Sequence, residues 1–175
     1  RHSFPTRRSS DLLDIFPRGV FYPALKEMGV DAFNYGLRDF TPSTYSKTVM
    51  QGSEIISFKT LSEAFINVKV RLEKQTSPTY IHLYFDKIDA DAHEYGPNSA
   101  QAEAEIETFL PTLLRLRDDI GCGILIVDHD MRLIMNLCDR IHVLNYGKTI
   151  GEGTPEQVRS EPAVIEAYLG AEEAA

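Results

Sequence analysis

YIHLYFDKIDADAHEYGPNS, residues 80–99, joins an apolar run to a polar turn that is rich in carboxylates. Residues 80–85 are apolar nearly throughout and follow Pro78, a pattern typical of a strand buried inside a parallel sheet. In such sheets the chemistry gathers just beyond the carboxyl ends of the strands. We therefore expect residues 86–99 to border a functional site.

Strand and helix patterns alternate before this stretch. Helices are expected over residues 23–28, 45–51 and 61–75, and strands over residues 30–35 and 55–58. The third helix has apolar residues at spacings of three and four, as in an amphipathic helix: Leu61, Ala64, Phe65, Val68 and Leu72. The alternation predicts an α/β fold with parallel strands.

Asp89 and His93 are the first candidate site residues. They are four residues apart, so one helical turn would place a carboxylate and an imidazole on the same face, where they can share a metal ion. Gly96 and Pro97 would end that turn, and Ser99 would cap the next helix. When the pair is taken alone, a solvated acidic turn explains it better than a metal site does.

The apolar strand, the pattern D-x-x-x-H-x-Y-G-P-x-S and the acidic helix after it resemble the type I phosphodiesterase and nucleotide pyrophosphatase branch of the alkaline phosphatase superfamily. The resemblance covers residues 13–112. It implies that Asp89 and His93 match two ligands of one zinc in a two-zinc site, and that the substrate is a phosphate ester or nucleotide. The family's nucleophile has no counterpart, because TPST at residues 41–44 predicts a proline turn.

The sequence changes character at about Leu113. Residues 124–127 predict a buried strand, residues 131–137 a helix, and residues 141–144 a second strand that ends in a tight turn at Gly147. The residues of the helix with core spacing are Met131, Ile134, Met135 and Cys138. Gly121 is expected to end the helix before this region.

Two capped helices are expected at the C-terminal end. Thr154, Pro155 and Gln157 supply an N-cap, a proline at the first helical position and a capping-box partner. Pro162 would open the last helix and Gly170 would close it. The apolar positions of these helices are expected to make packing contacts: Val158, Val164, Ile165, Tyr168 and Leu169.

Residues 113–175, including the terminal AYLG, closely resemble the C-terminal end of an ATP-binding cassette (ABC) ATPase, specifically the ATP-binding subunit of branched-chain amino acid importers. The resemblance implies that His129 is the switch histidine, whose imidazole contacts the γ-phosphate of ATP. Asp128 stands where that family usually has Glu. The implied partners are the transporter membrane subunits and a second ATPase subunit, at the cytoplasmic face of the inner membrane.

The motifs that would hold ATP are absent from the sequence. It contains no G-x-x-x-x-G-K-[ST] and no LSGGQ-like signature. Asp86 ends an apolar strand, but Lys87 follows it where a catalytic Glu should stand. ATP and Mg²⁺ are therefore not expected to bind this chain, and autonomous ATP hydrolysis is not expected.

Composition excludes several classes of protein. The chain has 175 residues and a net charge of −8, with no basic face, which argues against a nucleic-acid or anionic-membrane binder. Its apolar runs are far shorter than the roughly 20 residues that cross a bilayer. Cys122 and Cys138 form no CxxC pair. Residues 1–12 resemble a translated sequencing adapter and are expected to be non-native.

These observations favour a chimera of two incomplete parallel-sheet lobes, residues 13–112 and 113–175, with a seam near Pro111 and low stability. Two alternatives stay open. One is a single metal-dependent phosphodiesterase with Asp89, His93, Asp128 and His129 as zinc ligands. The other is a non-catalytic transporter-interaction module over residues 151–170.

Overall fold

The computed structural model describes residues 21–169. The chain divides into two compact units, Arg1–Cys122 and Gly123–Ala175. Three of the expected features, the adapter-like residues 1–12, the helix stop at Gly170 and the side chain of Leu169, lie outside the described part. The division falls about ten residues after the boundary expected at residues 112 and 113, because one long helix belongs entirely to the first unit.

A three-stranded parallel sheet forms the centre of the first unit. Its strands are β1 (Asp31–Leu37), β2 (Glu54–Phe58) and β3 (Thr79–Leu83), in the order β2-β1-β3. In the register, Tyr35 of β1 lies beside Ile56 on one side and Leu83 on the other. The α/β fold class expected from the sequence is confirmed.

The expectation that β3 lies inside the sheet is wrong for the described residues. β3 pairs only with β1 and is half-buried along its whole length. An apolar run predicts a strand but not its position in a sheet, because that position depends on which other strands are present. The described part of the first unit supplies no neighbour for the outer edge of β3.

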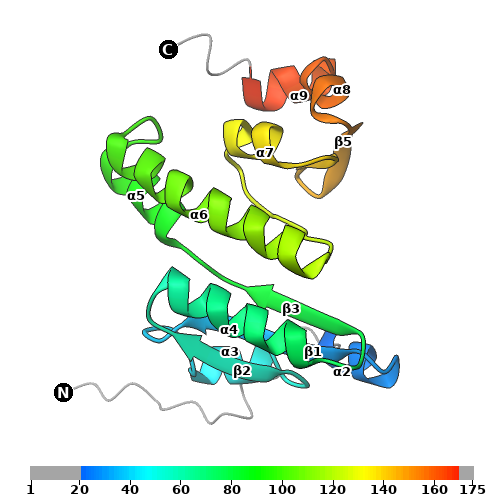
Figure 1. The fold of residues 1–175 in the computed structure, drawn as a ribbon. Helices are drawn as coiled ribbons and strands as arrows, with labels where there is room; N and C mark the ends of the chain where they lie inside the picture. The colour runs from blue at the N-terminus through cyan, green and yellow to red at the C-terminus, as the bar shows by residue number, and fades with distance from the viewer. Residues whose placement is uncertain (1–20, 170–175) are drawn as a thin grey trace, which may run out of the picture. The chain divides into compact units, whose positions relative to one another are not determined.

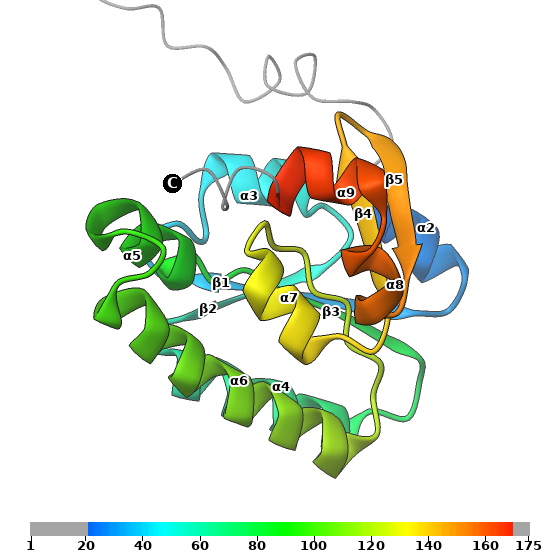
Figure 2. The same cartoon turned by 90° about the horizontal axis from the view of Figure 1, so that it is seen from above.

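Helices cover both faces of this sheet. After α2 (Phe21–Glu27), α3 (Thr44–Val49) connects β1 to β2, and α4 (Leu61–Lys74) crosses back from β2 to β3. The connection from β1 to β2 and the connection from β2 to β3 cross the sheet in opposite directions. Because both crossovers join parallel strands and such crossovers are right-handed, α3 and α4 lie on opposite faces of the sheet, as Figure 2 shows. β1, the central strand, is covered on both sides.

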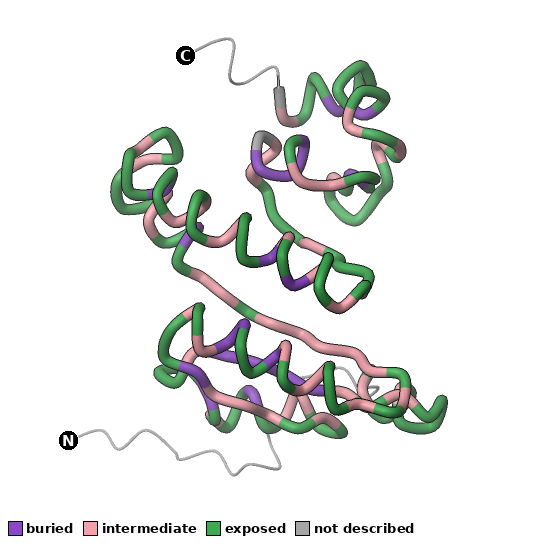
Figure 3. The backbone as a smooth tube through the Cα atoms, viewed as in Figure 1, coloured by how far each residue is buried: buried purple, intermediate pink, exposed green. Residues whose placement is uncertain are grey.

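The core of the first unit lies between β1 and α4 (Figure 3). Its largest buried side chains are Phe33, Tyr35, Phe58, Phe65 and Val68. The expected apolar face of α4 is confirmed, since Ala64, Phe65 and Val68 are its buried residues. Phe109, on the next long helix, packs against Phe65 with 5.7 Å between the ring centroids.

Two helices follow β3, α5 (Lys87–Tyr95) and α6 (Ala100–Ile120). The expected caps are present: Ser99 Oγ accepts a hydrogen bond from the amide of Ala102, and Gly121 ends α6 in the left-handed conformation. α6 continues through Pro111 (Figure 1), so the proline removes one backbone donor without ending the helix.

The second unit contains α7 (Met131–Leu137), a hairpin of β4 (Ile141–Asn145) and β5 (Lys148–Gly153), and the short helices α8 (Pro155–Arg159) and α9 (Pro162–Val164), which a π-helical turn (Ile165–Leu169) extends. Tyr146 and Gly147 join the strands with positive φ angles, as a two-residue hairpin turn requires. The capping box of Thr154 and Gln157 is confirmed.

A separate hydrophobic core holds the second unit together. Its buried residues are Ile134, Met135, Ile141, Val143, Val158 and Val164, and Ile126, Met131, Cys138, Ile150 and Tyr168 pack against it. The core positions expected in α7 are therefore confirmed, as are the packing positions Val158, Val164 and Tyr168. Ile165 is exposed instead.

Residues 124–127 do not form the buried strand that the sequence predicts. They belong to no sheet, and the side chains of Leu125 and Val127 are exposed. A strand buried on both faces needs a neighbour on each side. Within residues 123–169 the only sheet is the β4–β5 hairpin, which provides neither.

Candidate functional site

The carboxyl ends of β1, β2 and β3 form one edge of the parallel sheet, where functional groups of α/β proteins gather. Three segments start there: residues 38–43 after β1, residues 59 and 60 after β2, and residues 84–86 after β3. Of the residues expected to carry chemistry, Asp89 and His93 follow β3 at this edge.

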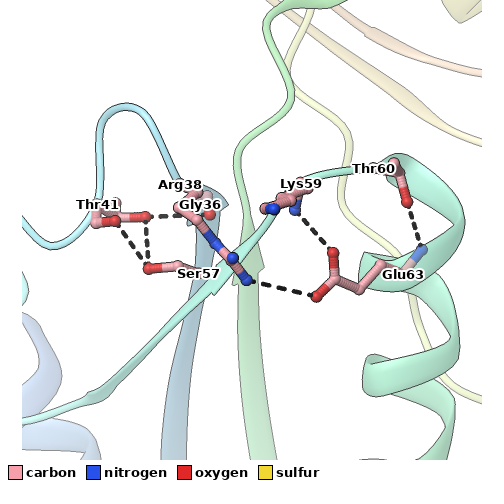
Figure 4. A network of polar contacts seen from close by, with 7 residues as sticks. All are labelled: Gly36, Arg38, Thr41, Ser57, Lys59, Thr60 and Glu63. Atoms are coloured by element: carbon pink, nitrogen blue, oxygen red, sulfur yellow. Dashed lines mark hydrogen bonds and ion pairs between the residues drawn. The ribbon is translucent and has the colours of Figure 1, made fainter.

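Thr41 joins the loop after β1 to β2. Its hydroxyl donates to the carbonyl oxygens of Gly36 and Leu37, at 3.0 and 2.9 Å. Ser57 Oγ donates to the carbonyl oxygen of Thr41 at 2.8 Å, and Figure 4 shows the contacts of Thr41 with Gly36 and Ser57. Thr41 is buried, and a Cβ on Gly36 would lie 2.7 Å from its methyl group. Thr41 therefore holds the loop in place and is not presented as a nucleophile.

Glu63 occupies the positively charged end of α4. Its carboxylate accepts a hydrogen bond from the Lys59 amide at 2.8 Å and lies 3.9 Å from the Arg38 guanidinium, while its own amide donates to Thr60 Oγ1 (Figure 4). A carboxylate at a helix N-terminus satisfies unpaired amides and the helix dipole. These interactions are those of a capped helix start rather than of an open anion site.

Asp89 and His93 lie together on one face of α5, as their spacing predicts. His93 Nε2 is 3.4 Å from Asp89 Oδ1, and both side chains are largely exposed. Within residues 21–169, no cluster of three or more His, Cys, Asp or Glu side chains is arranged to hold a metal ion. The described part of the chain thus offers two zinc-type ligands here, whereas protein zinc sites use three or four.

Two buried polar atoms near this edge were not anticipated from the sequence. Nδ1 of His82, on β3, and Oδ1 of Asp86, directly after it, have no hydrogen-bond partner among the described residues. Burial lowers the pKa of His82, which favours its neutral form. An isolated His inside an apolar run gives no sequence signal for such burial.

His129 lies in the turn that leads into α7. Asp128 Oδ1 accepts a hydrogen bond from the Asp130 amide at 2.8 Å, and Asp130 Oδ1 accepts one from the Leu133 amide at 3.2 Å. The His129 side chain between them is 71% exposed, with Nδ1 4.0 Å from Asp128 Oδ1. The turn therefore fixes the backbone and presents the imidazole to solvent.

A second polar cluster of this unit lies on the β4–β5 hairpin. Glu152 contacts Arg140 at 2.6 Å and His142 at 3.6 Å, and His142 Nε2 lies 2.9 Å from Thr149 Oγ1. The Arg140 guanidinium lowers the pKa of Glu152. These exposed residues pair across antiparallel strands, which sequence patterns did not identify because the strand register brings them together.

The four residues of the single-enzyme alternative are divided between the units. Asp89 and His93 belong to the first unit, and Asp128 and His129 to the second.

Comparison with known proteins identifies relatives of the C-terminal region. The family of the branched-chain amino acid ATP-binding cassette transporter matches residues 148–174. The transport ATP-binding protein LivG of Escherichia coli K12 is 48% identical over 58 residues, which are 33% of this chain and 23% of LivG. BraF of Pseudomonas aeruginosa is 41% identical over 66 residues, 38% of this chain and 26% of BraF.

A zinc import ATP-binding protein, ZnuC of Brucella abortus, is 43% identical over 56 residues, 32% of this chain and 18% of ZnuC. No solved structure matches the chain. Within residues 21–169, no helix has the length and apolar content needed to cross a membrane. The chain spans about a quarter of the length of the LivG and BraF proteins, and its C-terminal region is similar to the C-terminal part of branched-chain amino acid transport ATP-binding proteins.

Proposed function

We propose that the second unit is the C-terminal part of the ATP-binding subunit of a branched-chain amino acid importer. The family match over residues 148–174 carries this proposal, because it falls within the compact unit Gly123–Ala175. The 48% identity to LivG over 58 residues supports it. In that role the unit would work at the cytoplasmic face of the membrane. Its partners would be the importer's membrane subunits and a second ATPase subunit.

His129 is the residue that would act on ATP in this role. Its exposed imidazole precedes α7 and lies outside the hydrophobic core of the unit, where it could contact a γ-phosphate oxygen. The sequence contains no phosphate-binding loop, so the residues of this chain do not fit ATP and Mg²⁺ by themselves. The rest of an ATPase would have to supply that loop.

A graft into a relative tests the proposal. Residues 123–175 would replace the corresponding C-terminal residues of LivG, and leucine uptake and ATP hydrolysis of the assembled transporter would be measured. We expect the graft to retain both activities. His129→Ala in the graft should lower ATP hydrolysis by about 100-fold, since a positioned imidazole contributes on that scale.

His142→Ala is the matched control, because His142 is also an exposed histidine of the second unit but lies on the hairpin. It should leave ATP hydrolysis within about twofold of the unmutated graft. An inactive, misassembled graft would contradict the family role. Full activity of the His129→Ala graft would instead support the non-catalytic module over residues 151–170.

We also infer a second candidate function, a fragment of a zinc-dependent phosphodiesterase or pyrophosphatase in the first unit, fused to the ATPase fragment. The observation in its favour is the 3.4 Å pair of Asp89 and His93, placed directly beyond β3. Asp89 and His93 would hold the zinc ion, which when bound would polarise a phosphoryl group. With two ligands, the described residues fit a zinc site only in part.

Isothermal titration calorimetry of the chain with Zn²⁺ tests this candidate. The chain should bind one Zn²⁺ weakly, with a dissociation constant above about 10 μM, because two protein ligands leave most of the coordination shell to water. Asp89→Asn and His93→Gln should each abolish the binding. Asp91→Asn, on the same helix, is the control and should bind zinc as the parent chain does; equal binding by all variants would rule the pair out.

A further inference from the structure

Two carboxylates flank His129, and both accept hydrogen bonds from the backbone. Asp128 Oδ1 accepts one from the Asp130 amide at 2.8 Å, and Asp130 Oδ1 accepts one from the Leu133 amide at 3.2 Å. The first contact is an Asx turn, in which an Asp side chain binds the amide two residues later. The second is an N-cap contact, since Asp130 directly precedes α7. Together they hold the backbone from Asp128 to Leu133.

The helix α7, yellow in Figure 1, attaches this turn to the core of the second unit. The carbonyl oxygen of Asp130 accepts a hydrogen bond from the Ile134 amide at 3.1 Å, which makes Asp130 the residue at which the helix begins. Ile134 and Met135 are buried in the core, and Met131 packs against it. A series of short contacts therefore connects the core, through α7, to the backbone of His129.

The two side chains at positions 128 and 129 differ in exposure. The Asp128 side chain is 24% exposed, whereas that of His129 is 71% exposed. Asp128 Oδ1 lies 4.0 Å from the imidazole Nδ1, which is longer than a hydrogen bond, so this oxygen binds the backbone rather than the ring. The carboxylate holds the turn, and the imidazole is the group that the turn presents to solvent.

We propose that Asp128 and Asp130 are positioning residues for His129, which act through the backbone of the turn and do not contact ATP. The inference rests on the proposed function, in which the imidazole contacts a γ-phosphate oxygen. A misplacement of about 1 Å can slow a reaction about 100-fold, so an exposed reacting side chain depends on a well-ordered backbone. The two carboxylates order that backbone by contacts within residues 128–133.

Substitution by Asn and by Ala separates this role from an effect of charge. Asn forms Asx turns and N-caps as Asp does, but it carries no charge, whereas Ala forms neither contact. Asp128→Asn and Asp130→Asn should therefore keep the turn, and the two Ala variants should loosen it. If the negative charges acted directly on His129, Asn and Ala would have equal effects.

Amide hydrogen exchange of the full chain, followed by NMR, tests the turn without ATP. Relative to intrinsic rates, Asp128→Ala should speed exchange at the Asp130 amide about fivefold, and Asp130→Ala should do the same at the Leu133 amide. The Asn variants should stay within about twofold of the parent chain. Exchange of both amides at their intrinsic rates in the parent chain would overturn the proposal.

ATP hydrolysis by the graft of residues 123–175 into LivG tests the role in catalysis. Asp130→Ala should lower kcat about fivefold, with KM for ATP unchanged, because a smaller fraction of molecules holds the imidazole in place. Asp130→Asn should keep kcat within about twofold of the unmutated graft. Thr154→Ala is the matched control, since Thr154 is the N-cap of α8, a helix that does not carry His129, and it should leave kcat unchanged.

A double-mutant cycle distinguishes positioning from a general loss of stability. In a His129→Ala graft, Asp130→Ala should have no further effect on ATP hydrolysis, because its effect depends on the imidazole. A fivefold loss in both backgrounds would overturn the inference, and so would equal rates for Asp130→Asn and Asp130→Ala. A His129→Ala graft as active as the unmutated graft would overturn the proposed function itself, and the positioning role with it.

Discussion

Val164→Asp is expected to lower the free energy of unfolding of the second unit by about 4 kcal/mol or more, roughly a 1,000-fold change in the ratio of folded to unfolded unit. Val164 is completely buried in the core that α7, the hairpin and α8 share. A Cβ on Gly151 would lie 2.7 Å from a Val164 methyl group, so the packing here leaves no space for water. A carboxylate would be desolvated with no partner.

Hydrogen exchange measured by mass spectrometry checks this result, because peptides from residues 131–160 report on the second unit alone. Ile165→Asp is the matched control, since Ile165 is the next residue of the same helical segment and is exposed. It should change protection by less than about 1 kcal/mol. Equal loss of protection in both variants would show that burial of Val164 is not what stabilises the unit.

The local structure of the chain was predictable because its signals are short-range. Ser99, Gly121 and the pair of Thr154 and Gln157 each act on backbone groups within four residues, so the sequence contains the whole interaction. The same holds for the apolar face of α4. Asp89 and His93 meet for this reason too, since a helix brings residues four apart together.

Features that depend on distant segments were not predictable. The sequence places apolar runs at β3 and at residues 124–127, but whether a run is buried depends on neighbouring strands elsewhere in a sheet. β3 lies at an edge, and residues 124–127 have no neighbour among the described residues. An apolar run therefore predicts a strand that would be buried between neighbours, but it does not show that those neighbours are present.

The same limit applies to the candidate sites. The Thr41–Ser57 contact joins residues 16 apart, and the Arg140–Glu152 pair joins residues 12 apart. Each contact joins a residue just outside a strand to a residue of a neighbouring strand, so it forms only when the strands pair, and their register is set by tertiary packing. Thr41 consequently resembles part of a reactive TPST turn in the sequence, whereas in the fold its hydroxyl is engaged by two carbonyl oxygens.

Phe58→Ala should lower the free energy of unfolding of the first unit by about 3–5 kcal/mol, the usual cost of removing a buried aromatic ring. Phe58 is fully buried at the end of β2, where its carbonyl oxygen also accepts a hydrogen bond from the Arg38 amide. The cavity would therefore lie under the loops at the carboxyl ends of β1 and β2. Loosening of these loops should accompany the loss of stability.

The loss of stability is measured by urea unfolding, with hydrogen exchange in residues 31–74 as the probe of the first unit. Hydrogen exchange in the second unit provides an internal reference. Phe40→Ala is the control, since Phe40 is the same residue type, lies in the loop after β1 and is more than half exposed. It should cost less than about 1 kcal/mol. Because the two units have separate cores, Phe58→Ala should leave protection of residues 131–160 unchanged, and parallel loss in both units would mean that the chain unfolds as one cooperative domain.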